Sequence, residues 1–165
     1  MTNNGKRTIF HSFADAFRGI WDCISTERNM RIHLSAACYV LFFGFRMGLT
    51  RGELACLALT IGVVLSAEAM NTSVEKLCDF IEKRQNPHIR VIKDIAAGAV
   101  LLSALAAVLV GLFTFLRPAL WEAVLELCRT PALLVPFLLF VLLDLVFIFA
   151  GPLRIAKWVA GKKRR

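Results

Sequence analysis

The sequence lacks the residue pairs that crosslink small secreted domains or hold structural zinc. Its five cysteines are an odd number and form no Cys-x-x-Cys pair, and its three histidines show no metal-ligand spacing. We therefore expect reduced cysteines that behave as small apolar residues, with neither a disulfide framework nor a zinc site. The cysteines are Cys23, Cys38, Cys56, Cys78 and Cys128, and the histidines are His11, His33 and His88.

Several motifs that mark known classes of enzyme or transporter are also missing. The sequence has no P-loop, no glycine-rich nucleotide loop and no protein-kinase catalytic loop, so the generic kinase motifs give no support to a kinase. It has no internal repeat, whereas a transporter is expected to show repeat symmetry or broken spans in matching positions. His11, Asp15 and Arg18 soon follow the first apolar residues, so we expect no signal peptide.

Apolar side chains, by contrast, are abundant. Of the 165 residues 58% are hydrophobic and the mean hydropathy is +0.65, more than a soluble domain of this size normally carries. The formal net charge of +8 would indicate a nucleic-acid partner in a soluble protein, but in a membrane protein the position of the charges matters more. We therefore expect an all-α integral membrane protein with no nucleic-acid partner, whose basic tail faces anionic headgroups.

Four segments are expected to cross the membrane. They are residues 32–49, 52–70, 95–116 and a fourth stretch between Arg129 and Arg154. The third carries no charge and is the clearest span. The first is short, because its charge-free part ends at Phe45 and Arg46 must reach the far interface.

The segment before the first span has the pattern of an amphipathic helix. Its apolar residues recur at helical spacing, at Phe10, Phe13, Phe17, Ile20, Trp21 and Ile24. Such a stripe is suited to a helix that lies in a membrane interface, although a helix of a soluble core would show the same stripe.

Lysine and arginine are concentrated in the N-terminal segment, in the connection 76–93 and in the C-terminal tail. The positive-inside rule therefore predicts that these three parts lie in the cytoplasm. We divide the chain into a cytoplasmic surface helix (1–31), a three-span core (32–116) with a polar connection (68–94), and an extra transmembrane helix with a basic cytoplasmic tail (117–165).

A row of polar residues begins inside the second span. Glu68, Asn71, Glu75 and Asp79 are three, four and four residues apart, which keeps them on one face of a helix for roughly 16 Å. An acid at the apolar boundary suits a general base for a hydroxyl, and an acid nearer the water suits Mg²⁺ shared with phosphates. Lys93 would supply positive charge for phosphate. A polar network that merely holds helices together fits the same spacing.

Three runs of the sequence resemble the bacterial diacylglycerol kinase and undecaprenol kinase family. They are FRGIWDCISTERNMRIH (Phe17–His33), EAMNTSVEKLCD (Glu68–Asp79) and IKDIAAGAVLL (Ile92–Leu102). The resemblance covers about residues 6–116 and makes 32–116 the lipid kinase core. It implies a homotrimeric kinase of the bacterial cytoplasmic membrane that moves the γ-phosphate of ATP to a lipid alcohol. Its active sites would lie at the cytoplasmic interface, shared between neighbouring subunits.

The resemblance also implies roles for individual residues. Glu68 matches the catalytic base, and Glu27 and Glu75 match the pair that binds Mg²⁺ with ATP. Lys93 and Asp94 match the nucleotide-binding pair. The remaining matches are Asp79 near the nucleotide, Arg7 (or Lys6) at a phosphate-contacting position, Asn71 beside the base, Arg31 as a substrate-binding or supporting residue, and the segment Arg84 to His88 at the nucleotide.

The form of the surface-helix run, Glu-Arg-Asn followed by Arg-Ile-His, looks more like the undecaprenol kinases. Undecaprenol is therefore the expected acceptor, and diacylglycerol is the alternative. A non-catalytic membrane scaffold is a further alternative, but a scaffold would not need the acids and Lys93 together. Residues 130–165 have no counterpart in the three-span members. Asp144, the one charge of the fourth span, would serve either a function or a contact between helices.

Overall fold

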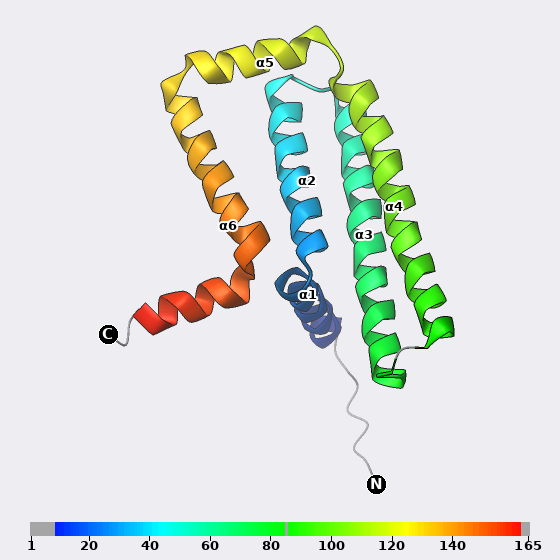
Figure 1. The fold of residues 1–165 in the computed structure, drawn as a ribbon. Coiled ribbons are helices and arrows are strands. Elements are labelled where there is room, and N and C mark those ends of the chain that lie inside the picture. Colours follow the sequence, from blue (N-terminus) through cyan, green and yellow to red (C-terminus); the bar gives the residue numbers. More distant parts are fainter. Residues whose placement is uncertain (1–8, 85, 163–165) are drawn as a thin grey trace.

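The protein is built from helices that run side by side, with two shorter helices crossing their ends (Figure 1). The computed structural model describes residues 9–84 and 86–162, with side chains up to residue 155. Within these residues there are six helices and no strand, as the all-α prediction requires. The helices are α1 (Ile9–Thr26), α2 (Arg28–Arg46), α3 (Arg51–Ile81), α4 (Pro87–Phe115), α5 (Pro118–Arg129) and α6 (Pro131–Lys162).

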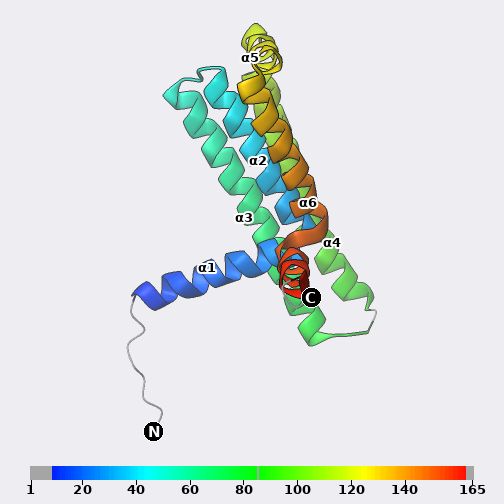
Figure 2. The same cartoon turned by 90° about the vertical axis from the view of Figure 1, so that its left-hand side faces the viewer.

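Helix α1 runs across the ends of the long helices instead of along them (Figure 2). Of its residues only Cys23 is buried, and Phe10, Phe13, Phe17 and Trp21 are exposed. A helix of a soluble core would cover such a stripe, whereas a helix in a membrane interface presents it to lipid. The arrangement favours the interfacial interpretation of this segment.

Three of the described helices are long and apolar enough to cross a membrane, judged by length and composition: α3, α4 and the part of α6 over Pro131–Ile155. They correspond to the second, third and fourth predicted spans. The predicted first span, 32–49, differs from the structure, in which α2 begins at Arg28 and ends at Arg46. Arg28, Arg31 and His33 lower the mean hydropathy of its first turns, so α2 is less apolar than the three helices that are apolar enough to cross a membrane. It lies between α3 and α6 (Figure 1).

Local sequence signals fix where α3 and α4 begin. Thr50 forms a capping box with Glu53, in which the Glu53 N–H donates to Thr50 Oγ1 at 3.3 Å and the Thr50 N–H donates to Glu53 Oε2 at 2.8 Å. At the start of α4, the side chain of Asn86 accepts from the His88 N–H at 2.9 Å, and Pro87 occupies the first turn. Each cap contributes about 1 kcal/mol to its helix.

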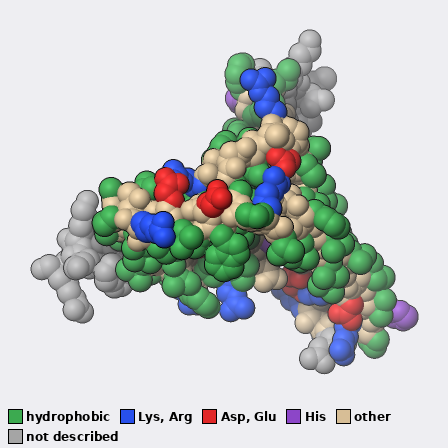
Figure 3. All heavy atoms as spheres, turned by 90° about the horizontal axis from the view of Figure 1, so that it is seen from above, with side chains coloured by type: hydrophobic (Ala, Val, Ile, Leu, Met, Phe, Trp, Pro, Cys, Tyr) green, Lys and Arg blue, Asp and Glu red, His purple; other side chains and the backbone are tan. Residues whose placement is uncertain are grey.

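Helix α5 was not predicted, because we expected only a connection between the third and fourth spans. It crosses the end of the molecule opposite α1 and buries Ala123 and Leu127 (Figure 1). Two ion pairs hold this end together, one between Arg46 and Glu126 and one of 2.5 Å between Arg117 and Glu53. Figure 3, which looks onto this end, shows charged side chains along it and hydrophobic side chains on the flanks.

Helix α6 returns along α2 and makes a polar contact with it inside the apolar region. Asp144 is buried and accepts from Ser35 Oγ at 2.5 Å and from the Tyr39 hydroxyl at 3.0 Å. The ring of Tyr39 packs edge-on against Phe140, with 5.6 Å between centroids. Of the two roles considered for Asp144, the structure shows the contact between helices.

Candidate active site

The row of polar residues, called the acid row below, occupies one face of the second half of α3, as its spacing predicts. It consists of Glu68, Asn71, Glu75 and Asp79. Glu68 is only 2% exposed, and Asn71 and Thr72 are buried beside it. One turn further on, Asn71 Nδ2 donates to Glu75 Oε1 at 3.0 Å. The row therefore passes from a buried carboxyl group at Glu68 to a partly exposed one at Glu75.

Two acceptors of this row have no hydrogen-bond partner among the described residues. They are Glu68 Oε2 and Asn71 Oδ1, both buried. Leaving a buried polar group unpaired costs about 1–3 kcal/mol, so folded proteins rarely do so without a reason. Both atoms are oxygens, and oxygen is the ligand that Mg²⁺ prefers.

Glu27 lies at the corner between α1 and α2, where it is the N-cap residue of α2 in an extended conformation. The negative charges of Glu27 and Glu75 both act on Glu68, so the fold brings three predicted site acids into electrostatic range of one another. Carboxylate oxygens of Glu27 and Glu75 fit a hard divalent cation by their chemistry. In the described part of this single chain, however, no three His, Cys, Asp or Glu side chains are close enough together to hold a metal ion.

Two contacts that were not predicted hold the end of α1 against the acid row. The Cys23 thiol donates to Thr72 Oγ1 at 3.3 Å, and Asp22 forms an ion pair with Lys76. Burial raises the pKa of the Cys23 thiol, which keeps it protonated and able to donate. The sequence signal was available in part, since Thr72 and Lys76 are four residues apart and share one face of α3. These contacts fix the corner that carries Glu27.

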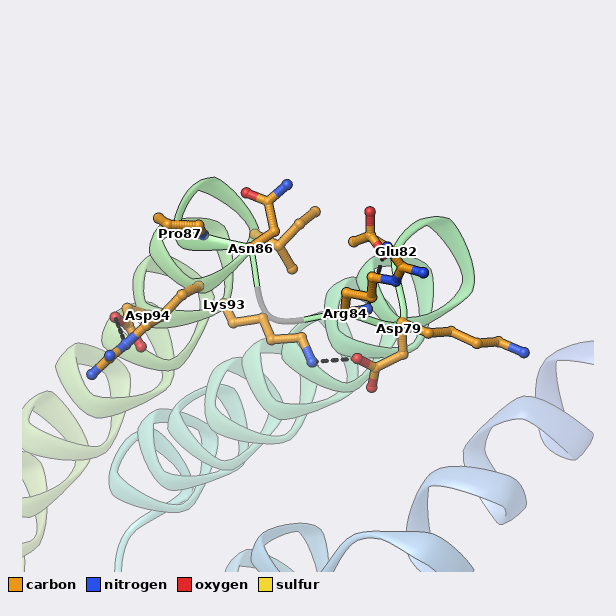
Figure 4. Close-up of a pocket in the computed structure, with 10 residues that line it drawn as sticks. Asp79, Glu82, Arg84, Asn86, Pro87, Lys93 and Asp94 are labelled. Carbon is orange, nitrogen blue, oxygen red and sulfur yellow. Dashed lines mark hydrogen bonds and ion pairs between the residues drawn. The ribbon is translucent and has the colours of Figure 1, made fainter.

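A cavity of about 650 Å³ opens at the last residue of the acid row, Asp79, between the end of α3 and the start of α4 (Figure 4). Lys93 and Asp79 point toward one another across it and form an ion pair of 2.6 Å. Arg90 and Asp94 pair along α4 at 3.8 Å. Its lining is rich in charge of both signs and consists of Asp79, Glu82, Lys83, Arg84, Asn86, Pro87, Ile89, Arg90, Lys93 and Asp94.

The cavity gathers three of the predicted nucleotide-binding residues, Asp79, Lys93 and Asp94. Of the segment Arg84 to His88, it includes Arg84, Asn86 and Pro87. Arg7 and Lys6 lie outside the described residues. Arg31 is directed elsewhere, because its guanidinium donates to the backbone carbonyls of Ile24, Ser25 and Ile148.

A second cavity, of about 380 Å³, lies between α2, α3 and α4 and is almost entirely apolar. On α4 three of its four lining residues are small and recur at helical spacing, Ala104, Ala107 and Gly111, which leaves room between the helices. On α3 it reaches Val64 and Leu65, one helical turn before Glu68. The full lining is His33, Ala36, Ala37, Val40, Leu57, Thr60, Ile61, Val64, Leu65, Ala104, Ala107, Val108 and Gly111.

About two thirds of this chain is similar to known proteins. Residues 14–115 match the model of the prokaryotic diacylglycerol kinase family. The undecaprenol kinase of Bacillus subtilis (strain 168) is 41% identical over 113 residues, which are 68% of this chain and 92% of that protein. A diacylglycerol kinase of Synechocystis sp. (strain PCC 6803) is 37% identical over 110 residues, which are 66% of this chain and 63% of that protein. No solved structure matches the chain.

Spanning helices, a buried acid row and these matches together define an integral membrane enzyme, an ATP-dependent phosphotransferase that acts on a lipid. The chain belongs to the prokaryotic diacylglycerol kinase family. The matched residues end at Phe115, so α5 and α6 lie outside the region that the family model covers.

Proposed function

We propose that the enzyme phosphorylates undecaprenol, with Glu68 as the general base. The observation that carries this proposal is the burial of Glu68. The residue is only 2% exposed, and its Oε2 atom has no hydrogen-bond partner among the described residues. A base must lie within hydrogen-bond reach of the proton that it removes. The apolar cavity between α2, α3 and α4 ends one turn from Glu68, which supports binding of the lipid chain there with its hydroxyl group at the carboxylate.

The reaction then needs positioning more than covalent chemistry. Glu68 accepts the hydroxyl proton as the lipid oxygen bonds to the γ-phosphorus of ATP. The bond from that phosphorus to the bridging oxygen breaks, and ADP leaves. Lys93 neutralises phosphate charge in the larger cavity, and its ion pair with Asp79 holds the ammonium group in place. Asp94 contacts the nucleotide from the same cavity, and Arg7 contacts its phosphates.

Glu27 and Glu75 are the residues that we propose to hold Mg²⁺. When bound there, the cation would neutralise charge on the ATP phosphates. The Asn71 amide orients Glu75 through its 3.0 Å hydrogen bond, which is the supporting role that we assign to Asn71. We propose further that the enzyme is a homotrimer whose neighbouring subunits complete each site, as the resemblance of the three runs implies.

The active site is proposed to face the cytoplasm of a bacterial cell. The start of α2, the turn between α3 and α4 and the end of α6 lie at one end of the molecule, and α5 lies at the other (Figure 1). Most lysine and arginine residues in the described part of the chain belong to the former end, which supports this orientation in the cytoplasmic membrane.

Undecaprenol is preferred as the acceptor on the basis of similarity. The relative named undecaprenol kinase is matched over 92% of its length, and the relative named diacylglycerol kinase over 63%. Diacylglycerol is the second candidate, because it also presents a primary hydroxyl group and the second relative carries that name.

Transfer of labelled phosphate from Mg-ATP in mixed micelles tests both candidates. Undecaprenol and diacylglycerol are offered separately, with Glu68→Gln as the inactive control. We expect label on undecaprenol that is lost in the variant. Preference for diacylglycerol would keep the mechanism and change the acceptor. Failure to label either lipid, from folded protein, would contradict the proposed function and favour a scaffold.

A further inference from the structure

Helix α6 is interrupted where Gly151 precedes Pro152. Gly151 has φ 68° and ψ 156°, a conformation that glycine adopts far more easily than other residues. Pro152 has no N–H, so the carbonyl group of Ile148, four residues earlier, loses its helical donor. The Gly-Pro pair thus leaves a free acceptor on the face of α6.

Arg31 of α2 binds this acceptor. Its Nε donates to the Ile148 carbonyl at 3.1 Å, and the residue is only 6% exposed. A Cβ atom at Gly151 would lie 3.2 Å from the guanidinium carbon of Arg31. Glycine therefore suits this position for its backbone angle, and any larger residue would also push the guanidinium group of Arg31 by a few tenths of an ångström.

The same guanidinium group also caps α1. Its Nη1 donates to the carbonyls of Ile24 at 2.9 Å and Ser25 at 3.4 Å, in the last turn of that helix. The final carbonyls of a helix lack intrahelical donors and carry partial negative charge, so a cation is favoured there. Arg31 therefore joins the end of α1 to the break in α6. Glu27 lies close to these bonds, because it follows the last residue of α1 and is the N-cap residue of α2.

Other contacts keep α6 in register along α2. Asp144 binds Ser35 and Tyr39, and the guanidinium of Arg28 lies 5.9 Å from the centroid of the Phe149 ring. The residues of α2 that make these contacts share one face of the helix, because they are three, four and four residues apart: Arg28, Arg31, Ser35 and Tyr39. With α6 held in this register, its break meets Arg31.

We propose that α6 is a positioning element for the active site: its Gly151–Pro152 break binds Arg31, and Arg31 holds Glu27 against the acid row of α3. Arg31 and Gly151 are positioning residues, not catalytic ones. This inference rests on the proposed role of Glu27 in binding Mg²⁺. It gives a role in the reaction to a helix that lies beyond the residues matched by the family model.

The first test is the Mg²⁺ requirement of the full-length enzyme with Arg31→Gln and Gly151→Ala. Loss of a residue that orients a metal ligand typically weakens metal affinity by about 10-fold or more. We expect the half-saturating Mg²⁺ concentration to rise by that factor, while kcat at saturating Mg²⁺ changes by less than about 3-fold. Arg31→Lys should be intermediate, because one ammonium group does not reproduce the fork that reaches both helices.

Two controls make this test specific. Arg46→Gln changes an arginine at the other end of α2, which pairs with Glu126, and should leave the Mg²⁺ requirement unchanged. In a Glu27→Gln background, Arg31→Gln should add no further rise, because both changes act on the same ligand. Full additivity of the two changes would overturn the proposal.

Alkylation of Cys23 gives a readout that does not depend on activity. Cys23, at the end of α1, is buried and bonds to Thr72 of α3, so we expect its burial to depend on the position of that end. We expect Arg31→Gln and Gly151→Ala to speed maleimide labelling of Cys23 severalfold, measured by mass spectrometry. Cys78, which is buried on α3, should stay slow.

The two readouts separate the possible failures. Equal acceleration at Cys23 and Cys78 would indicate general loss of packing and would overturn the inference, as would unchanged labelling of Cys23. If the enzyme phosphorylated neither lipid, the proposed function would fail, and the labelling would still decide whether α6 holds this corner. If Arg31→Gln does not fold, Pro152→Ala is used in its place. The N–H of the new alanine would compete with Arg31 for the Ile148 carbonyl group.

Discussion

Glu68 and Asp144 are two buried acids in apolar helices, and they differ in their partners. Asp144 is 8% exposed, and both its carboxylate oxygens accept hydrogen bonds, from Ser35 and Tyr39. Glu68 is 2% exposed, and one of its oxygens accepts none from the described residues. A satisfied buried acid stabilises a contact between helices, whereas an unsatisfied one is available to a substrate or cation. The partners therefore assign Asp144 to a contact between helices and support the role of base that we propose for Glu68.

The sharpest way to break this comparison is Glu68→Gln. The amide keeps the shape of the side chain but is no longer a base, so we expect kcat to fall by about 10²- to 10⁴-fold. Phosphate transfer to lipid measures it, with thermal unfolding to show that the fold is kept. Glu122→Gln, at an exposed acid of α5, is the matched control and should keep full turnover. Turnover within threefold of the parent in Glu68→Gln would exclude Glu68 as the base.

The comparison extends to ion pairs at the two ends of the molecule. Lys93 pairs with Asp79 in the larger cavity, and Arg46 pairs with Glu126 beside α5. We expect Lys93→Ala to raise KM for ATP by about 10-fold, which corresponds to about 1.4 kcal/mol. Steady-state kinetics with varied ATP measure it. Arg46→Ala should leave KM for ATP unchanged, and an equal rise in both variants would contradict a nucleotide site at Lys93.

Asp144→Asn should show the reverse of Glu68→Gln, with an effect on stability that exceeds the effect on turnover. The change weakens two hydrogen bonds between α2 and α6, and such bonds in membrane proteins are worth about 1 kcal/mol or less each. A thermal unfolding series in detergent measures the loss. A fall in kcat as large as that of Glu68→Gln, with stability unchanged, would show that Asp144 takes part in the reaction.

The smallest effect concerns Cys23, a buried group with one partner. Because burial raises its pKa in the folded state, the unfolded chain loses the proton first as the pH rises. The stability that depends on the protonated thiol is therefore present at neutral pH and is lost above its ordinary pKa, by about 1.4 kcal/mol for each unit of pKa difference. The melting temperature of the parent should fall more between pH 7.5 and pH 10 than that of Cys23→Ala. Parallel curves would contradict the burial of the thiol.

Periodicity and capping made much of the fold predictable. The amphipathic stripe of α1, the long apolar runs of α3, α4 and α6, and the single face shared by Glu68, Asn71 and Glu75 all follow from local patterns. Helix α5 was missed because it is a short amphipathic segment that begins directly after Arg117, at Pro118, where we expected a connection. The prediction gave a span over residues 32–49 and no bounds for the helix that carries it, and α2 begins earlier, at Arg28, and buries Arg31 in its first turn.

The sequence by itself determined most of the helices and the face of α3 on which the row of acids and amide lies. It also carried the resemblance that associates these residues with a lipid kinase. Only the tertiary structure decided which buried groups are satisfied. It paired Asp144 with Ser35 and Tyr39, directed Arg31 to a carbonyl freed by Pro152, and left Glu68 with an unpaired oxygen. The physical reason is that periodicity fixes the face of a helix on which a side chain lies. Hydrogen bonding depends on what the neighbouring helix places opposite that face.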